Sequence, residues 1–162
     1  MNMKKMLYVC CIVLLSVACK PMQKVGNARQ VLDYGSPSVK QELINDQMFF
    51  IKEHTVDEKY GYTEENPIMV GGANEMEGPI NERRFLNALL GPNGEEISYQ
   101  RVGSCCHFST KNLRSDRTMG LLDRYAITYE GLKTPIILYI NMYDSDILKV
   151  PVGFTLRYNI SF

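Results

Sequence analysis

The first 18 residues constrain the fold most, because they are not expected to be part of it. Lys4 and Lys5 give a positively charged start, and residues 6–17 form an apolar run of 12 residues. A membrane-spanning helix needs about 20 apolar residues, so this run is too short to span and is typical of a secretory signal peptide. Removal of residues 1–18 from the 162-residue chain leaves 144 residues, the size of one ordinary domain.

The leader ends in "SVAC", residues 16–19, a small residue followed by cysteine. This ending resembles the lipobox of bacterial lipoproteins, in which the cysteine thiol is diacylated and becomes the mature N-terminus. Ser16 stands where that motif prefers leucine. Acyl chains such as palmitate on Cys19 would anchor the chain, since each buried methylene contributes roughly 0.8 kcal/mol. The alternatives are a secreted protein cut near Ala18 and an uncleaved anchor.

The residue after this cysteine is Lys20 rather than aspartate, which favours the outer membrane, on its periplasmic or surface face, over retention in the inner membrane. Residues 19–35 are polar and contain Pro21 and Gly26, so we expect a lipidated cysteine and a flexible tether. Residues 36–162 are then the single folded domain.

The charge of the mature chain argues against nucleic acid as a partner. Without the leader, 16 Lys and Arg face 18 Asp and Glu, a net charge of about −2, and no long run of like charge occurs. Nucleic-acid binding needs a basic face that neutralises phosphates. The expected partners are the lipid bilayer and an envelope protein or glycan, with no cofactor.

Two segments predict helices. Ser36 and Pro37 precede a capping-box pattern of Ser38 and Gln41, which predicts a short helix over residues 37–46.

The second helix is expected in "NERRFLNALLGP", residues 81–92, behind a turn-rich loop at 71–79. Asn81 is its expected cap, and Gly91 with Pro92 its end. Its apolar residues recur at helical spacing: Phe85, Leu86, Leu89 and Leu90.

Strands are predicted where β-branched and aromatic residues alternate with polar ones. Ile97, Tyr99 and Arg101 share one face of the second predicted strand. The short link "EGLKTP" predicts a hairpin between the third and fourth. The predicted elements follow in the order helix, strand, helix and then a run of strands. This order predicts an α+β fold with a mainly antiparallel sheet and about two helices. The predicted strands cover residues 48–56, 97–108, 121–131, 134–143 and 150–162.

"SCCHF", residues 104–108, holds the only cysteines that stay in the mature domain apart from the lipidated one. In an oxidising compartment Cys105 and Cys106 can pair only with each other. This favours a vicinal disulfide, and Gly103 before the pair eases the bend that such a ring needs. The close alternative is a reduced pair packed as small hydrophobes.

Two chemical interpretations of the same cluster are weaker. A metal site would need Cys105, His107 and the distant His54 with carboxylates to complete a tetrahedral shell, and adjacent cysteines cannot easily bind one ion together. A catalytic thiol would need a separately oriented base, which His107 does not offer by its position. No residue is predicted to be catalytic, and no metal is expected.

Three blocks of the chain resemble a family of small secreted lipoproteins from Gram-negative gut and environmental bacteria. They are "NERRFLNALLGPNGEEISYQRVGSCCHF", "LLDRYAITYEGLKTPIILYINMYD" and "VPVGF", within residues 60–154. Some members carry the label 2-dehydro-3-deoxyphosphooctonate aldolase, an enzyme that resembles a TIM barrel. Eight strand–helix units take about 250 residues, and the enzyme's phosphoenolpyruvate substrate is cytoplasmic, so that reaction is not expected of an exported domain of 144 residues.

Two functions remain. The first is a membrane-tethered binding or assembly module for a protein or glycan, for which an exposed aromatic patch would speak. The second is a small envelope enzyme, redox or lyase-like, that uses Cys105, Cys106 and His107 in a concave pocket. The exposed arginines of the second helix could grip an anion, although a solvated surface is favoured. The residues concerned are Tyr60, Tyr62, Tyr139 and Tyr143 for the patch and Arg83 and Arg84 for the anion.

Overall fold

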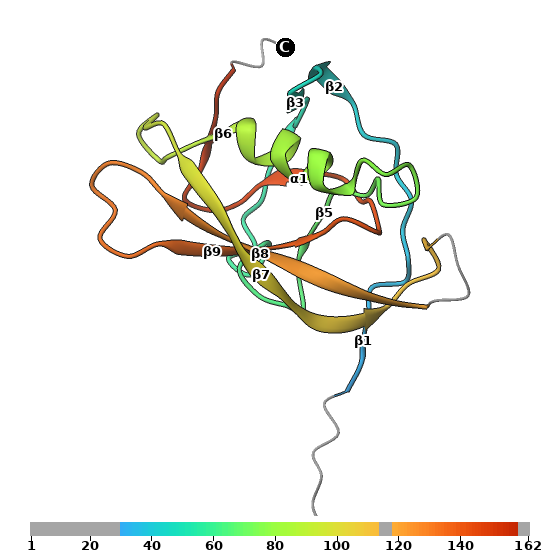
Figure 1. Cartoon of the computed structure of the whole chain (residues 1–162). Coiled ribbons are helices and arrows are strands. Elements are labelled where there is room, and N and C mark those ends of the chain that lie inside the picture. The colour runs from blue at the N-terminus through green and yellow to red at the C-terminus, as the bar shows by residue number, and fades with distance from the viewer. Residues whose placement is uncertain (1–29, 114–117, 159–162) are drawn as a thin grey trace, which may run out of the picture.

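A computed structural model describes residues 30–113 and 118–158 (Figure 1). The predicted signal peptide, Cys19 and most of the predicted tether lie outside these residues. The described chain is an α+β domain of mostly short strands around one curled sheet, with a single helix. The predicted fold class is confirmed. Within the described residues no helix is long and apolar enough to cross a membrane.

The main sheet has five strands in the order β1-β7-β8-β9-β5. The long strands β7 and β8 are antiparallel, and β9 follows β8 in the predicted hairpin, whereas β1 and β5 add short parallel edges. These three central strands confirm the strands expected near 97–108, 121–131 and 134–143. The five strands are β1 (Leu32–Asp33), β7 (Ser98–Ser109), β8 (Met119–Thr128), β9 (Ile136–Asn141) and β5 (Ile68–Met69).

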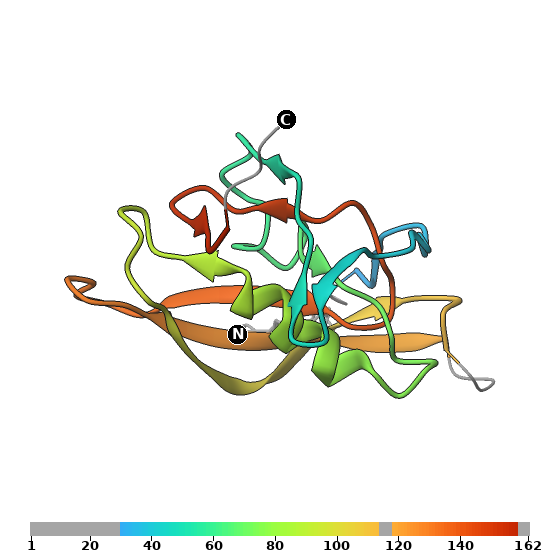
Figure 2. The same cartoon turned by 90° about the horizontal axis from the view of Figure 1, so that it is seen from above.

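Three small two-stranded ladders complete the described sheet structure. The C-terminal segment contributes one strand to each of two ladders, and in Figure 2 it lies on one side of the long β7–β8 ribbon. One ladder is the hairpin of β2 (Leu43–Asn45) and β3 (Met48–Phe49). The other two join β4 (Glu53–His54) to β10 (Lys149–Val150) and β6 (Leu89–Leu90) to β11 (Thr155–Leu156).

The helix α1 (Gly78–Asn87) starts and ends earlier than the sequence suggested, and Leu89 and Leu90 form β6 instead of its last turn. Asn81 is not its cap but lies buried inside it, where its amide donates to the Gly71 carbonyl at 3.1 Å. Pro79 opens the helix instead, since proline suits the first turn. A Cβ on Gly78 would lie 2.8 Å from the Met142 sulfur, so glycine lets this turn approach the end of β9.

The apolar face of α1 packs against the inner face of the sheet. Phe85 and Leu86 are fully buried, and alternate residues of β8 and β9 are buried with them. The register pairs Tyr125 with Leu138, and both point into this core because side chains alternate along a strand. Burying large apolar side chains contributes roughly 1.5–3 kcal/mol each, which makes this the main stabilising contact of the domain.

The helix predicted over residues 37–46 is wrong. Ser38 instead forms a bridge with Ser145, and the Val39 N–H donates to the Ser145 carbonyl at 2.8 Å. Ser36 has a left-handed φ of 54°, which does not fit the entry of a helix. The Gln41 side chain reaches the Asp146 carbonyl, so long-range hydrogen bonds replace the local capping box.

Two boundaries also differ from expectation. The strand expected at 48–56 is broken into β3 and β4, because the Ile51 N–H between them donates to the Tyr158 hydroxyl instead of to a strand partner. Leu32 and Asp33, placed in the tether, form β1, where Leu32 pairs with Phe108.

Candidate functional site

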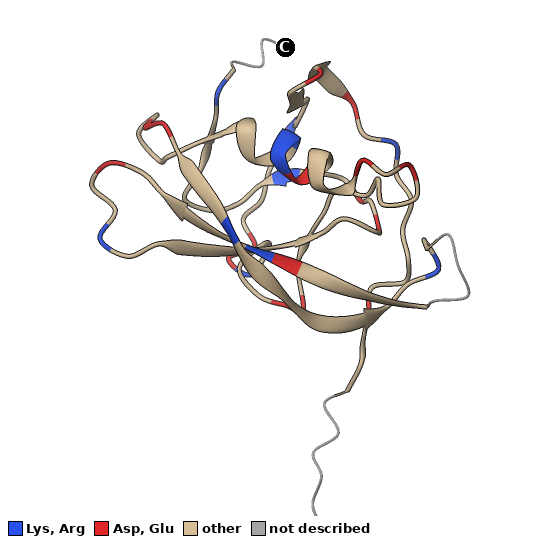
Figure 3. Cartoon of the chain, in the orientation of Figure 1, with Lys and Arg blue, Asp and Glu red and all other residues tan. Residues whose placement is uncertain are grey.

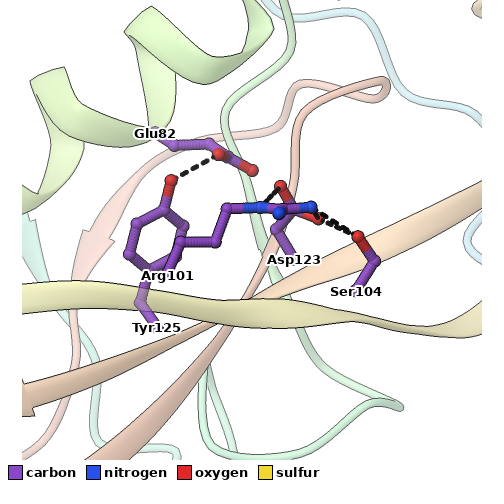
Figure 4. A network of polar contacts seen from close by, with 5 residues as sticks. All are labelled: Glu82, Arg101, Ser104, Asp123 and Tyr125. Carbon is purple, nitrogen blue, oxygen red and sulfur yellow. Dashed lines mark hydrogen bonds and ion pairs between the residues drawn. The ribbon is translucent and has the colours of Figure 1, made fainter.

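A polar network fills the space between α1 and the middle of the β7–β8 pair (Figure 4). Arg101 on β7 faces Tyr125 on β8, and Ser104 faces Asp123, so the strand register brings the four side chains together. The Arg101 guanidinium donates from Nε and Nη2 to the two Asp123 carboxylate oxygens at 2.6 and 2.8 Å. Ser104 donates to the same carboxylate at 2.7 Å. The two-point ion pair fixes the plane of the guanidinium.

Glu82 reaches into this network from the buried side of α1. It has no exposed surface, and its Oε2 accepts a hydrogen bond of 2.7 Å from the Tyr125 hydroxyl. Its other oxygen, Oε1, is buried and has no hydrogen-bond partner among the described residues. Burial raises the pKa of Glu82 to about 7, against the opposing effect of the Tyr125 hydrogen bond, and the nearby Asp123 charge raises it further.

A groove lies over this network at the surface, and we call it the α1–β7 groove. Its volume is about 570 Å³, within the range of small-ligand sites. Tyr99 and Tyr125 pack edge to face in its wall, with ring centroids 6.1 Å apart. The lining combines four aromatic or apolar residues with four polar or charged ones: Pro79, Arg83, Tyr99, Gln100, Arg101, Asp123, Tyr125 and Met142.

The predicted cysteine cluster lies further along the same strand. Cys105 and Cys106 form a vicinal disulfide with an S–S distance of 2.14 Å. The β7 register shifts between Cys105 and His107, so Cys106 is the extra residue of a bulge, and its φ of 58° is left-handed. A neighbouring shift between Arg101 and Gly103 bends the strand at the polar network as well.

The structure does not assemble the metal or thiol sites weighed for this cluster. The two sulfurs are bonded to each other, so neither is a thiolate. Of the residues that the structure describes, the only group of three candidate ligands is Glu64, Cys105 and Cys106, and it lacks both histidines. His107 and His54 are exposed on β7 and β4.

A shallow cavity of about 400 Å³ touches the disulfide where β1 meets β7. Cys106 and His107 line it together with Glu64, Glu65 and the start of the described chain. The enzyme hypothesis predicted a concave pocket at the cysteine cluster, and this cavity is one. It lacks the free thiol that redox or lyase-like catalysis by this cluster would need.

The tyrosines expected to form an exposed aromatic patch do not form one. All four are only partly exposed. Tyr62 donates to the Val152 carbonyl, Tyr60 accepts from the Lys149 N–H at 3.2 Å, and Tyr143 packs against Phe108. Tyr60 and Tyr62 thereby hold the C-terminal segment through its backbone.

The arginines expected on the exposed side of the helix behave differently from each other. Arg83 is exposed, whereas Arg84 is partly buried and forms an ion pair with Glu77 at 2.7 Å. Arg84 also donates to Asn81 and to the Asp46 carbonyl, so it anchors the helix to the β2–β3 turn.

Comparison with known proteins gives no match: no family model, no curated protein and no solved structure is similar to this chain.

Proposed function

We propose that the protein is a lipid-anchored binding module of the bacterial cell envelope, held by acylated Cys19, that binds a glycan in the α1–β7 groove. The leader and the "SVAC" ending support the anchor and the export route. The paired state of Cys105 and Cys106 is consistent with an oxidising compartment, where such bonds persist.

The observation that carries the binding role is the lining of the groove. A sugar ring has apolar C–H faces and an edge of hydroxyl groups that both donate and accept. The exposed part of Tyr99, with Pro79 and Met142, supplies apolar surface for such a face. Arg101 stands at the same groove and offers guanidinium N–H groups to the hydroxyl edge. Most of the polar network is fixed by its own hydrogen bonds, so the site is preorganised.

The test is a glycan array probed with the full chain, purified from membranes in mild detergent. The expected result is binding that Tyr99→Ala weakens at least about tenfold, since stacking and burial of an aromatic contribute 1–2 kcal/mol or more. Tyr99→Leu, which keeps apolar bulk but removes the flat aromatic face, checks the same contact should Tyr99→Ala unfold.

The matched control is Tyr139→Ala. Tyr139 pairs with Arg124 on the face of the sheet opposite to the groove, so its loss is expected to leave glycan binding unchanged. Absence of any array signal, or equal losses in Tyr99→Ala and Tyr139→Ala, would contradict the proposal.

A further inference from the structure

We propose that the α1–β7 groove selects glycans bearing an anionic substituent, a carboxylate or a phosphate on the sugar, which Arg83 and Arg101 hold together. This inference rests on the proposed function and adds the chemical class of the ligand.

Arg83 is the first cation available to such a group. It is exposed on the first turns of α1, lines the groove, and forms no ion pair with any described residue. Its charge acts on the groove wall: burial raises the pKa of Tyr99, and Arg83 opposes that rise. In Figure 3 the blue of α1 lies above the blue and red segments where β7 crosses β8. The guanidinium therefore lies at the groove without an ion-pair partner among the described residues.

Arg101 is the second cation, and it is held in position. Its Nε and Nη2 bond to Asp123 and Ser104, whereas Nη1 makes none of these bonds. The side chain is 49% exposed although its carboxylate partner is buried. An arginine locked on one edge can present its remaining N–H groups to a carboxylate or phosphate without further loss of side-chain entropy.

The carboxylates of the groove do not cancel this positive charge. Asp123 is already matched by Arg101 and Ser104. Glu82 lies on the α1 side of the network, next to Tyr125 and Asp123 of β8 and Arg101 of β7. Because burial raises its pKa to about 7, its carboxyl is largely neutral below pH 7. Arg83 then leaves a local charge of about +1 in a mature chain whose 16 Lys and Arg face 18 Asp and Glu. A neutral glycan would leave that charge unused.

The experiment compares an oligogalacturonide with its fully methyl-esterified form, which has the same backbone and no charge, by calorimetry on the full chain at pH 6. The expected result is an affinity at least about tenfold higher for the acid, the typical contribution of a hydrogen bond to a charged group. Glucose 6-phosphate and glucose form the phosphate arm of the same comparison. Raising NaCl to 0.5 M should weaken only the charged ligands.

Arg83→Gln should remove most of the preference for the acid over the ester. The control Lys133→Gln takes the same charge from the exposed β8–β9 hairpin and should change neither affinity. Acid and ester binding equally, or array signals from neutral glycans alone, would overturn this inference and leave the proposed function standing. If no glycan binds at all, the proposed function fails as well.

Discussion

Replacement of the buried Glu82 by glutamine should make the domain more stable at neutral pH. Glutamine has the shape of the protonated carboxyl and can still accept the hydrogen bond from Tyr125, but it cannot ionise. In the wild-type chain an ionised Glu82 would be a buried charge close to the Asp123 carboxylate, with one oxygen that has no described partner. Such a charge destabilises the folded state.

The size of this effect follows from the difference between the pKa of Glu82 in the folded chain and in the unfolded chain. Burial first, and then the Asp123 charge, raise the pKa of Glu82 from its ordinary value of 4.5 to about 7 in the folded chain. Below pH 4.5 the group is protonated in both states and contributes nothing. Between pH 4.5 and 7 only the unfolded chain releases the proton, so the free energy of unfolding falls as the pH rises. Above pH 7 the full penalty, about 3 kcal/mol, is present.

The assay is urea unfolding followed by circular dichroism at pH 5, 6, 7 and 8. Glu82→Gln should change the free energy of unfolding by less than about 1 kcal/mol at pH 5 and raise it by about 3 kcal/mol at pH 8. Glu130→Gln makes the same substitution in the exposed hairpin, outside the polar network, and is the matched control. A Glu82→Gln effect of equal size at pH 5 and pH 8 would refute the reasoning, because it would show that the buried carboxyl does not titrate in this range.

Three further changes test the rest of the structure by the same unfolding measurement. Asp123→Asn should cost about 2 kcal/mol, since an amide cannot accept both bonds from Arg101; an unchanged stability would show that the ion pair is not formed. The double change of Cys105 and Cys106 to alanine should cost less than about 1 kcal/mol, because a bond between neighbours closes no loop of intervening residues; a loss above 2 kcal/mol would contradict this. Leu86→Ala should cost about 2–5 kcal/mol because Leu86 is fully buried, and a loss below 1 kcal/mol would place it outside the core.

The central sheet could be predicted because β8 and β9 are rich in β-branched and aromatic residues and the link between them is short. Ile136, Leu138 and Ile140 form one face of β9, and the core uses that face. The false helix at 37–46 shows the limit of local signals. Its capping pattern is real, but hydrogen bonds to Ser145 and Asp146, more than 100 residues away, outweigh it. Such long-range partners are invisible to propensity.

The candidate site was only half visible in the sequence. The cysteine pair drew attention by composition, whereas the polar network beside it did not. A signal existed: Glu82 lies three and four positions before Phe85 and Leu86, so the same helical face carries an acid and the core residues. Asp123 likewise interrupts an apolar strand. A charge at a core position points to a buried partner, but the partner itself, Arg101, needed the β7–β8 register.

The most direct measurement is hydrogen–deuterium exchange of the full chain with and without a glycan that binds on the array. The account predicts that slowed exchange concentrates at the first turns of α1 and at residues 98–104 of β7, the two walls of the α1–β7 groove. Protection at the opposite face of the sheet around Tyr139, or at the cavity beside Cys106 and His107, would contradict it.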